Sequence, residues 1–384
     1  MNLLPKKKIV VLGMISKHRV AGMAWITLHY LIGLQRLGYD VYYVEPQGGS
    51  PHDKSVRAAA WIAGIMRRFD MGDRWAFHAV YGDGRCYGLS ELALKELYRS
   101  SALIINLHGA SQPLPEIAAT GRLVYLETDP VELEIRIYNN DRTATEMLSA
   151  HCAFFTWGEN YGRPDCKVPL PLGFHFKPTR QPVVLDLWRR GGSSVSSQAF
   201  TTIGNWRQLI RQVEFQGEVY SWSKHYEFLK FIDLPAKTRQ PFELALNRYN
   251  DAEKAMLESK GWKVVPAGSF SRDIDSYQEY IKRSRGEFTV AKDQNVRLRS
   301  GWFSDRSATY LATGRPVINQ ETGFSNILPT GSGLFAFSTI EEIVQAVDKI
   351  NSDYEGHRQG ALNIAREYFS YDVVLPQLLA EVPL

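Results

Sequence analysis

The chain has 384 residues, more than a single hydrophobic core usually organises, so we expect two domains. Hydrophobic residues make up 44% and charged residues 22% of it, which excludes the disordered and fibrous classes. The formal net charge of +4 is too small for this length to demand a polyanionic partner.

The first residues and the cysteines predict a cytoplasmic protein. Lysines at positions 6–8 lead directly into the apolar run 9–12, which is much too short for a secretory signal or a membrane span. The three cysteines, Cys86, Cys152 and Cys166, have spacings that suit neither a disulfide framework nor a zinc site. This pattern favours a reducing compartment.

Apolar runs alternate with helical periodicity along the first part of the chain. Residues 9–13 predict a buried strand, residues 14–22 a loop, and residues 25–37 a helix that Gly38 ends. Further strands are expected at 41–44, 102–106, 123–127 and 152–156, with a short helix at 114–120. Because helices separate the strands, we expect parallel pairing in a doubly wound sheet that binds ligands at the carboxyl ends of its strands.

Prolines cluster between residues 162 and 179, and a glycine- and serine-rich stretch follows at 191–197. Such a composition marks a domain boundary. A second alternating series then predicts strands at 200–204, 217–220, 262–266, 286–291, 315–319 and 334–337. We therefore expect two tandem α/β domains, at 1–175 and 176–360, followed by a C-terminal helical segment at 361–384.

Three segments carry a resemblance to a known family. The stretch GMISKHRVAGMAWITLHYLIGLQRLGYDVYYVE, residues 13–45, resembles the opening of many GT-B glycosyltransferases. The stretch SGWFSDRSATYLATGRPVINQETGF, residues 300–324, resembles their donor-binding segment, with Ala312, Gly314 and Pro316 in its Ala-x-Gly-x-Pro element. The closing helix resembles the one that crosses back toward the first domain in that family.

The resemblance implies an α/β protein of the GT-B type, in which two Rossmann-like, doubly wound domains face each other across a cleft. It implies that the first domain binds the acceptor and the second binds the nucleotide sugar. The chain would then move a sugar from a nucleoside-diphosphate sugar, with a UDP-sugar favoured, to an unidentified acceptor and would use no other cofactor. A GT-B-type epimerase or phosphorylase and a non-catalytic nucleotide-binding module are the alternatives.

The chain departs from the family pattern at one pair of positions. Retaining members carry two glutamates here, whereas this chain has Gly301 and Thr309. We therefore expect inversion of the anomeric centre, a reaction that needs one general base to take the acceptor proton.

Several residues are candidates for the donor site, because a diphosphate leaving group needs positive charge or oriented N–H dipoles. Arg306 and Ser304 stand at the start of a predicted helix, and the guanidinium can grip two phosphate oxygens. Lys292 and Arg207 each follow a predicted strand. Each of these cations can instead be a structural or solvated side chain. Gly204 would allow close backbone approach. Gly22, the glycine of the first loop in the resemblance, is a further donor candidate or only a turn residue.

The loop 319–324 follows another predicted strand and adds donor candidates. By resemblance, Glu321 and Thr322 would meet the ribose or the sugar. Gly323 is expected to be chiefly conformational. A glutamate in a polar loop is also commonly just exposed.

Asp129 and His18 are the candidates for the general base. Asp129 follows the predicted strand 123–127 and resembles the Thr-Asp of phage DNA β-glucosyltransferases, although Thr-Asp-Pro is also an ordinary way to end a strand. His18 lies in the first loop between Lys17 and Arg19, which would depress its pKa. Glu127, on the same strand face as Asp129, is the second choice for the base at this strand end. His108, at another strand end, is a candidate for contact with the acceptor.

The remaining signals bear on metals and acceptors. No metal-ligand spacing is apparent in the sequence, so we expect a metal-independent enzyme. Trp206, Trp222 and Trp302 are either stacking faces or core. A small molecule or a glycan is the expected acceptor. A nucleic acid or anionic lipid is also raised by basic residues placed near the second-domain cleft, namely Lys282, Arg283, Arg285, Arg297 and Arg299.

Overall fold

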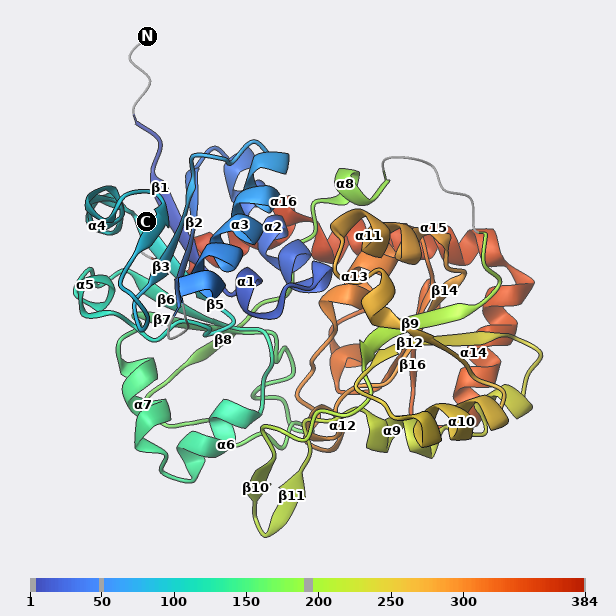
Figure 1. Cartoon of the computed structure of the whole chain (residues 1–384). Coiled ribbons are helices and arrows are strands. Elements are labelled where there is room, and N and C mark those ends of the chain that lie inside the picture. The colour runs from blue at the N-terminus through green and yellow to red at the C-terminus, as the bar shows by residue number, and fades with distance from the viewer. Residues whose placement is uncertain (1–4, 48–51, 190–195, 383–384) are drawn as a thin grey trace.

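The computed structural model describes residues 5–47, 52–189 and 196–382, and Figure 1 shows two α/β domains lying side by side. Most of the predicted boundary stretch 191–197 therefore lies outside the described residues. No helix in the described ranges is long and apolar enough to cross a membrane.

The first domain is built on a sheet with the strand order β4-β3-β2-β1-β5-β6-β7-β8. All neighbouring strands pair in parallel except β3 and β4. The strands are β1 (Lys8–Leu12), β2 (Asp40–Gln47), β3 (Trp75–Ala79), β4 (Cys86–Gly88), β5 (Leu103–Leu107), β6 (Leu123–Glu127), β7 (Ala153–Thr156) and β8 (Phe176–Pro178). The helices are α1 (Ile15–His18), α2 (Ala21–Arg36), α3 (His52–Arg68), α4 (Glu91–Ser100), α5 (Pro115–Ala118), α6 (Glu132–Tyr138), α7 (Arg142–Ser149) and α8 (Leu185–Arg189).

The second domain is built on a parallel sheet with the order β13-β12-β9-β14-β15-β16, beside a separate hairpin of β10 and β11. The strands are β9 (Phe200–Asn205), β10 (Val213–Phe215), β11 (Glu218–Tyr220), β12 (Phe242–Asn247), β13 (Lys263–Pro266), β14 (Gly286–Thr289), β15 (Val317–Gln320) and β16 (Leu334–Phe337). The helices are α9 (His225–Lys230), α10 (Asp251–Ser259), α11 (Ile274–Arg283), α12 (Asp293–Arg297), α13 (Asp305–Ala312), α14 (Ile340–Ser352), α15 (Tyr354–Ile364) and α16 (Tyr371–Ala380).

The central strands explain why the sheets form. β5 and β6 are buried along their whole length, and β1 is buried except at its first residue. Strands covered by helices on both faces need a continuous apolar run rather than alternation, which is the pattern that these segments have. The predicted parallel, doubly wound sheets are thereby confirmed.

The C-terminal helix returns to the first domain. α16 packs against α2, and Figure 1 shows this last helix among the N-terminal elements. The approach is close, since a Cβ atom placed on Gly33 would lie 2.6 Å from Leu375 Cδ1. The two domains are therefore joined by the boundary segment and by this returning helix.

Four local predictions differ from the structure. β8 belongs to the first sheet, so that sheet extends beyond the boundary expected at residue 175. The loop expected at 14–22 contains the short helix α1, and the strand expected at 217–220 lies in the β10–β11 hairpin rather than in the main sheet. The strands predicted for the second domain do not include β12, because a charged residue in its sequence FELALN interrupts the apolar run.

Candidate active site at the domain junction

The carboxyl ends of β6 and β14 bring Asp129 and Lys292 together from opposite domains. Lys292 Nζ donates to both carboxylate oxygens of Asp129, at 2.5 Å for Oδ1. The Lys292 side chain is 9% exposed and the Asp129 side chain 21% exposed. Both residues were predicted from their positions after strands, and the structure places them in a direct ion pair.

Two tryptophans line the Lys292 ammonium. Its nitrogen lies 3.7 Å from the ring centroid of Trp222 and 5.7 Å from that of Trp302. Trp302 also donates from its indole nitrogen to the Thr128 carbonyl oxygen at 3.0 Å. A cation on an aromatic face is held partly by the ring quadrupole. These two aromatic candidates therefore belong to the site, whereas Trp206 is buried in the core and donates to Glu253.

Lys224 is a second lysine at this junction and was not predicted. Its ammonium lies 5.5 Å from the Trp302 ring centroid and 3.5 Å from Thr289 Oγ1. Burial, then the charge of Arg306, hold the pKa of Lys224 well below its ordinary value. Among the described residues, no carboxylate lies within ion-pair distance of it. We call Asp129, Lys224, Lys292, Trp222 and Trp302 the junction cluster.

A sequence signal for Lys224 did exist. It lies four residues after β11, in the segment SWSKH, as a basic residue following the predicted strand 217–220. The sequence analysis missed Arg211 as well. Its Cζ atom lies 4.8 Å from the Trp222 ring centroid, and its Nη1 atom lies 4.0 Å from Asp129 Oδ2. Both belong to the irregular segment around the β10–β11 hairpin, where strand periodicity gives little guidance.

Arg306 is enclosed by protein groups rather than exposed for the predicted contact with the donor diphosphate. Its Nε donates to Glu287 at 2.5 Å, its Nη1 to the Ile203 carbonyl at 2.5 Å and its Nη2 to Thr289 at 3.0 Å. Glu287 is fully buried. The guanidinium is thus directed at protein acceptors, and the structure does not present it for the two-oxygen phosphate contact predicted from the sequence. Ser304, the N-cap of α13, is buried beside it and makes no side-chain capping bond.

Arg207 and Gly204 follow the carboxyl end of β9. Arg207 pairs through Nε with Glu253, and its side chain is 45% exposed. A Cβ atom at Gly204 would meet nothing within 4 Å, so the backbone there is open to close approach. Both remain donor-site predictions.

The loop 319–324 contacts the first domain at Gly323, and its polar side chains bond to groups of the second domain. Glu321 accepts from the Gly323 backbone N–H, and Thr322 donates to the Trp302 carbonyl at 2.7 Å. Gly323 adopts φ = 95° and lies against Asn160. Glu321 and Thr322 are therefore engaged within the protein, and their contact with the ribose or the sugar stays a prediction.

Glu127 is too enclosed to contact the hydroxyl group of an acceptor substrate. It is buried, accepts a hydrogen bond from Thr156 at 2.6 Å, and has a pKa raised well above its ordinary value by burial and then by Glu134. This burial corrects the prediction that Glu127 can replace Asp129 as base. Gly22 lies against the second domain, since a Cβ atom placed on it would be 3.5 Å from Tyr277 Oη, and it stays a donor-site prediction.

The two histidine candidates lie on the first-domain side. His108 Nδ1 is 2.6 Å from Thr128 Oγ1, and burial lowers its pKa to about 3, so it is neutral. The pKa of His18 is lowered by burial and then by Lys17. The predicted effect of a flanking cation is confirmed for Lys17, whereas the other contributing cations are Arg211 and Arg248 of the second domain. The structure thus brings His108 next to the Asp129 turn.

The basic residues that raised a nucleic-acid acceptor are not gathered in one patch. The end of α11 carries Lys282 and Arg283 to the amino end of β14, opposite the junction cluster. Arg285 stacks on Tyr354, while the other two pair with carboxylates, Arg297 with Glu218 and Arg299 with Asp165. This corrects the predicted placement near the cleft for Lys282, Arg283 and Arg285, whereas Arg299 pairs with Asp165 of the first domain.

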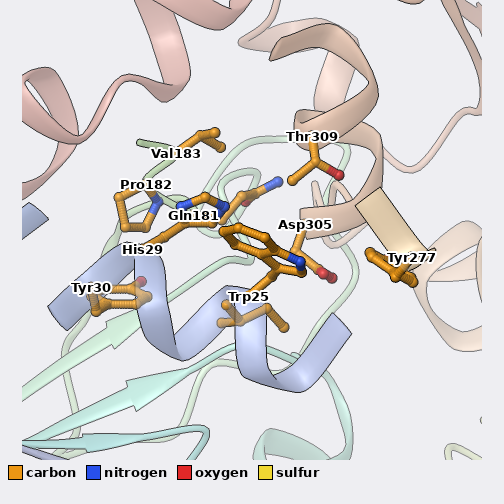
Figure 2. Close-up of a pocket in the computed structure, with 10 residues that line it drawn as sticks. Trp25, His29, Tyr30, Gln181, Pro182, Val183, Tyr277, Asp305 and Thr309 are labelled. Atoms are coloured by element: carbon orange, nitrogen blue, oxygen red, sulfur yellow. The ribbon is translucent and has the colours of Figure 1, made fainter. Parts of the chain in front are cut away.

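A small cavity also lies between the domains, close to α2 and α13. Figure 2 shows residues that line it, among them Trp25, His29 and Thr309. Its volume of about 10 Å³ is that of a single water-sized site. It cannot hold a nucleotide sugar, so we assign the candidate site to the junction cluster instead. The described residues contain no group of three His, Cys, Asp or Glu side chains suited to a metal ion.

Comparison with solved structures shows which fold this is. The Anabaena protein HepE with UDP-glucose superposes with a TM-score of 0.60, at 14% identity over 97% of this chain and 98% of that one. An alpha-glucosyltransferase with UDP gives 0.58, at 10% identity over 98% and 99%. AviGT4, a glycosyltransferase of avilamycin A biosynthesis, gives 0.53, at 11% identity over 97% and 96%.

The chain has the GT-B fold. The similarity spans essentially the full length of both partners, which confirms the predicted pair of facing doubly wound domains. No protein-family model matches the sequence, and no curated protein matches it either. The GT-B resemblance thus lies in the arrangement of elements, while most side chains have changed.

Proposed function

We propose that this GT-B protein is a glycosyltransferase that moves a sugar from a nucleoside-diphosphate sugar to a hydroxyl group of an acceptor. The observation that carries the proposal is Lys224, a half-buried lysine beside Lys292 and Arg306 with no carboxylate within ion-pair distance among the described residues. Desolvation and neighbouring cations make the charged form of Lys224 costly in free energy, and an anionic ligand would offset that cost, so a site of this kind is suited to an anion.

A diphosphate is the anion that the arrangement favours. Charge grows on the leaving diphosphate as the glycosidic bond breaks, and cations fixed in a desolvated site stabilise it. Lys224 and Lys292 would fill this role, so the proposed reaction requires no divalent cation. UDP-sugars are the favoured donors because solved GT-B neighbours contain UDP or UDP-glucose. We propose a small molecule or a glycan as acceptor.

The donor assignment is tested by calorimetric titration of UDP, GDP and dTDP into the full chain with EDTA present. Lys224→Met should weaken binding of the preferred nucleotide by about tenfold or more, the worth of one charge-assisted contact. The matched control is Lys254→Met on α10, whose side chain is 40% exposed and pairs only with Glu258. Equal affinity in the Lys224→Met variant and the wild type would remove Lys224 from the donor site.

We further propose that Asp129 is the general base of an inverting transfer. Its position after β6, paired with Lys292, would place a carboxylate next to the anomeric carbon and the incoming hydroxyl. Asp129→Asn should lower turnover by about a hundredfold or more. Glu132→Gln, which changes the next carboxylate along the chain, should leave turnover close to that of the wild type.

The configuration of the product tests the stereochemical half of this proposal. NMR of the product anomeric centre should show the configuration opposite to that of the donor. A product with the donor's own configuration would point to a retaining mechanism. Undiminished turnover in Asp129→Asn would leave His18 as the better candidate for the base.

A further inference from the structure

The Asp129–Lys292 pair connects the two domains. The partners are 163 residues apart in the sequence, and the ammonium contacts both oxygens of the carboxylate. The pair is nearly buried, and Trp222 covers the ammonium at 3.7 Å. In this state, Lys292 already has a full counter-charge, and neither oxygen of Asp129 is free of it.

The turn that carries Asp129 is held from the second domain on both sides of the aspartate. Trp302 donates to the Thr128 carbonyl at 3.0 Å, and Gln294 donates to the Pro130 carbonyl at 3.2 Å. Val131 closes the turn at φ = 98°, a conformation that a β-branched residue rarely adopts. Strained backbone persists where its surroundings fix it, so this turn is tightly positioned on Lys292.

Lys292 would therefore have two anionic partners, Asp129 and the diphosphate, if a diphosphate binds at the junction cluster. Lys224 and Lys292 both lie on Trp302, with their nitrogens 5.5 Å and 5.7 Å from its ring centroid, and the charge of Lys292 contributes to the lowered pKa of Lys224. A diphosphate on Lys224 would bring its oxygens to Lys292 as well. An ammonium has three donors, and two of those on Lys292 are directed at the Asp129 oxygens, so at most one is left for a phosphate oxygen while the ion pair persists.

We propose that Lys292 exchanges its ion-pair partner, Asp129, for the donor diphosphate when the donor binds, and we call this exchange the hand-over. The donor therefore binds first, and its binding frees Asp129 for the acceptor hydroxyl. This inference rests on the proposed function. Before the donor binds, the ion pair closes the domain junction and keeps the base occupied. Once Lys292 contacts phosphate, the carboxylate of Asp129 can accept a hydrogen bond from the acceptor.

A double-mutant cycle on UDP affinity tests the hand-over. Calorimetry is carried out on the full chain as wild type, Asp129→Asn, Lys292→Met and the double variant. Asp129→Asn should tighten UDP binding by about fivefold or more, because Lys292 no longer has to leave a carboxylate. Lys292→Met should weaken it. In the Lys292→Met background, Asp129→Asn should change nothing.

The cycle separates the hand-over from a plain charge effect. A plain charge effect would tighten UDP binding equally with and without Lys292, so equal tightening in both backgrounds would overturn the hand-over. Unchanged or weaker binding in Asp129→Asn would overturn it too. Asp129→Ala repeats the measurement with no side-chain oxygen left to hold Lys292.

Failure of the proposed function gives a different result. A wild-type chain that binds none of UDP, GDP and dTDP would overturn both the donor site and the hand-over. Nucleotide binding that depends on Lys224 but does not respond to Asp129→Asn would leave the proposed function standing and overturn the hand-over alone.

Discussion

Arg306 illustrates how one side chain can match a binding motif and still have a structural role. Its guanidinium pairs with Glu287, which is fully buried between strands of the second sheet. Removing one partner of such a pair leaves an uncompensated buried charge. The surface pair of Arg207 and Glu253 differs, because the Arg207 side chain is 45% exposed and solvent screens the interaction.

We therefore expect Arg306→Ala to lower the free energy of unfolding by about 3 to 5 kcal/mol. Arg207→Ala should cost less than about 1 kcal/mol. Urea denaturation followed by circular dichroism measures both. Should Arg306→Ala keep wild-type stability and instead lose UDP affinity, Arg306 would be a diphosphate ligand, as the sequence motif indicates.

At the scale of elements, the packing of α2 against α8 depends on a buried histidine. His29 of α2 is 3% exposed, and the Trp188 indole N–H donates to its Nε2 at 2.9 Å. Burial lowers the pKa of His29 from 6.5 to about 3, so the ring is neutral in the folded chain. The unfolded chain takes up a proton below pH 6.5, whereas the folded chain does not.

The stabilising contribution of His29 is consequently complete above pH 6.5 and is lost as the pH falls toward 3. We expect about 2 kcal/mol of this contribution to disappear between pH 7 and pH 5. Urea denaturation at the two pH values, on the wild type and on His29→Gln, measures it. The variant should show the smaller pH dependence, and equal slopes in the two proteins would contradict the assignment.

For the whole molecule, close contacts between backbones fix how the domains meet. Gly301 adopts φ = 82°, and a Cβ atom placed on it would lie 2.3 Å from the Asn160 backbone nitrogen of the first domain. The Asn160 N–H donates to the Ser300 carbonyl at 3.1 Å, so this backbone cannot retreat without losing that bond. The position that holds a glutamate in the retaining branch is thus closed to any side chain here.

Gly301→Ala should therefore destabilise the chain more than Gly331→Ala does, by roughly 1 to 3 kcal/mol. Gly331 is the matched control, because it also has a positive φ, 98°, but a Cβ atom there would meet nothing within 4 Å. Thermal and urea unfolding of both variants measure the difference. Equal losses in the two would mean that backbone conformation alone, rather than the domain contact, sets the cost.

The sequence by itself determined the two parallel sheets and the residues at their strand ends. Continuous apolar runs such as β5 and β6 encode burial on both faces, which is a local property of the chain. Asp129 and Lys292 were found because the residues that follow such strands lie at a ligand-binding edge. These inferences need only the pattern of neighbouring residues.

Only the tertiary structure decided which charges face each other. The pairing of Asp129 with Lys292, the burial of Arg306 on Glu287, and the place of Lys224 beside Trp302 all join residues far apart in the chain. The energy of a charge depends on its distance to other charges and on its exposure to water. Both quantities are set when the sheets and the domains pack together, so the periodicity of any single segment cannot contain them.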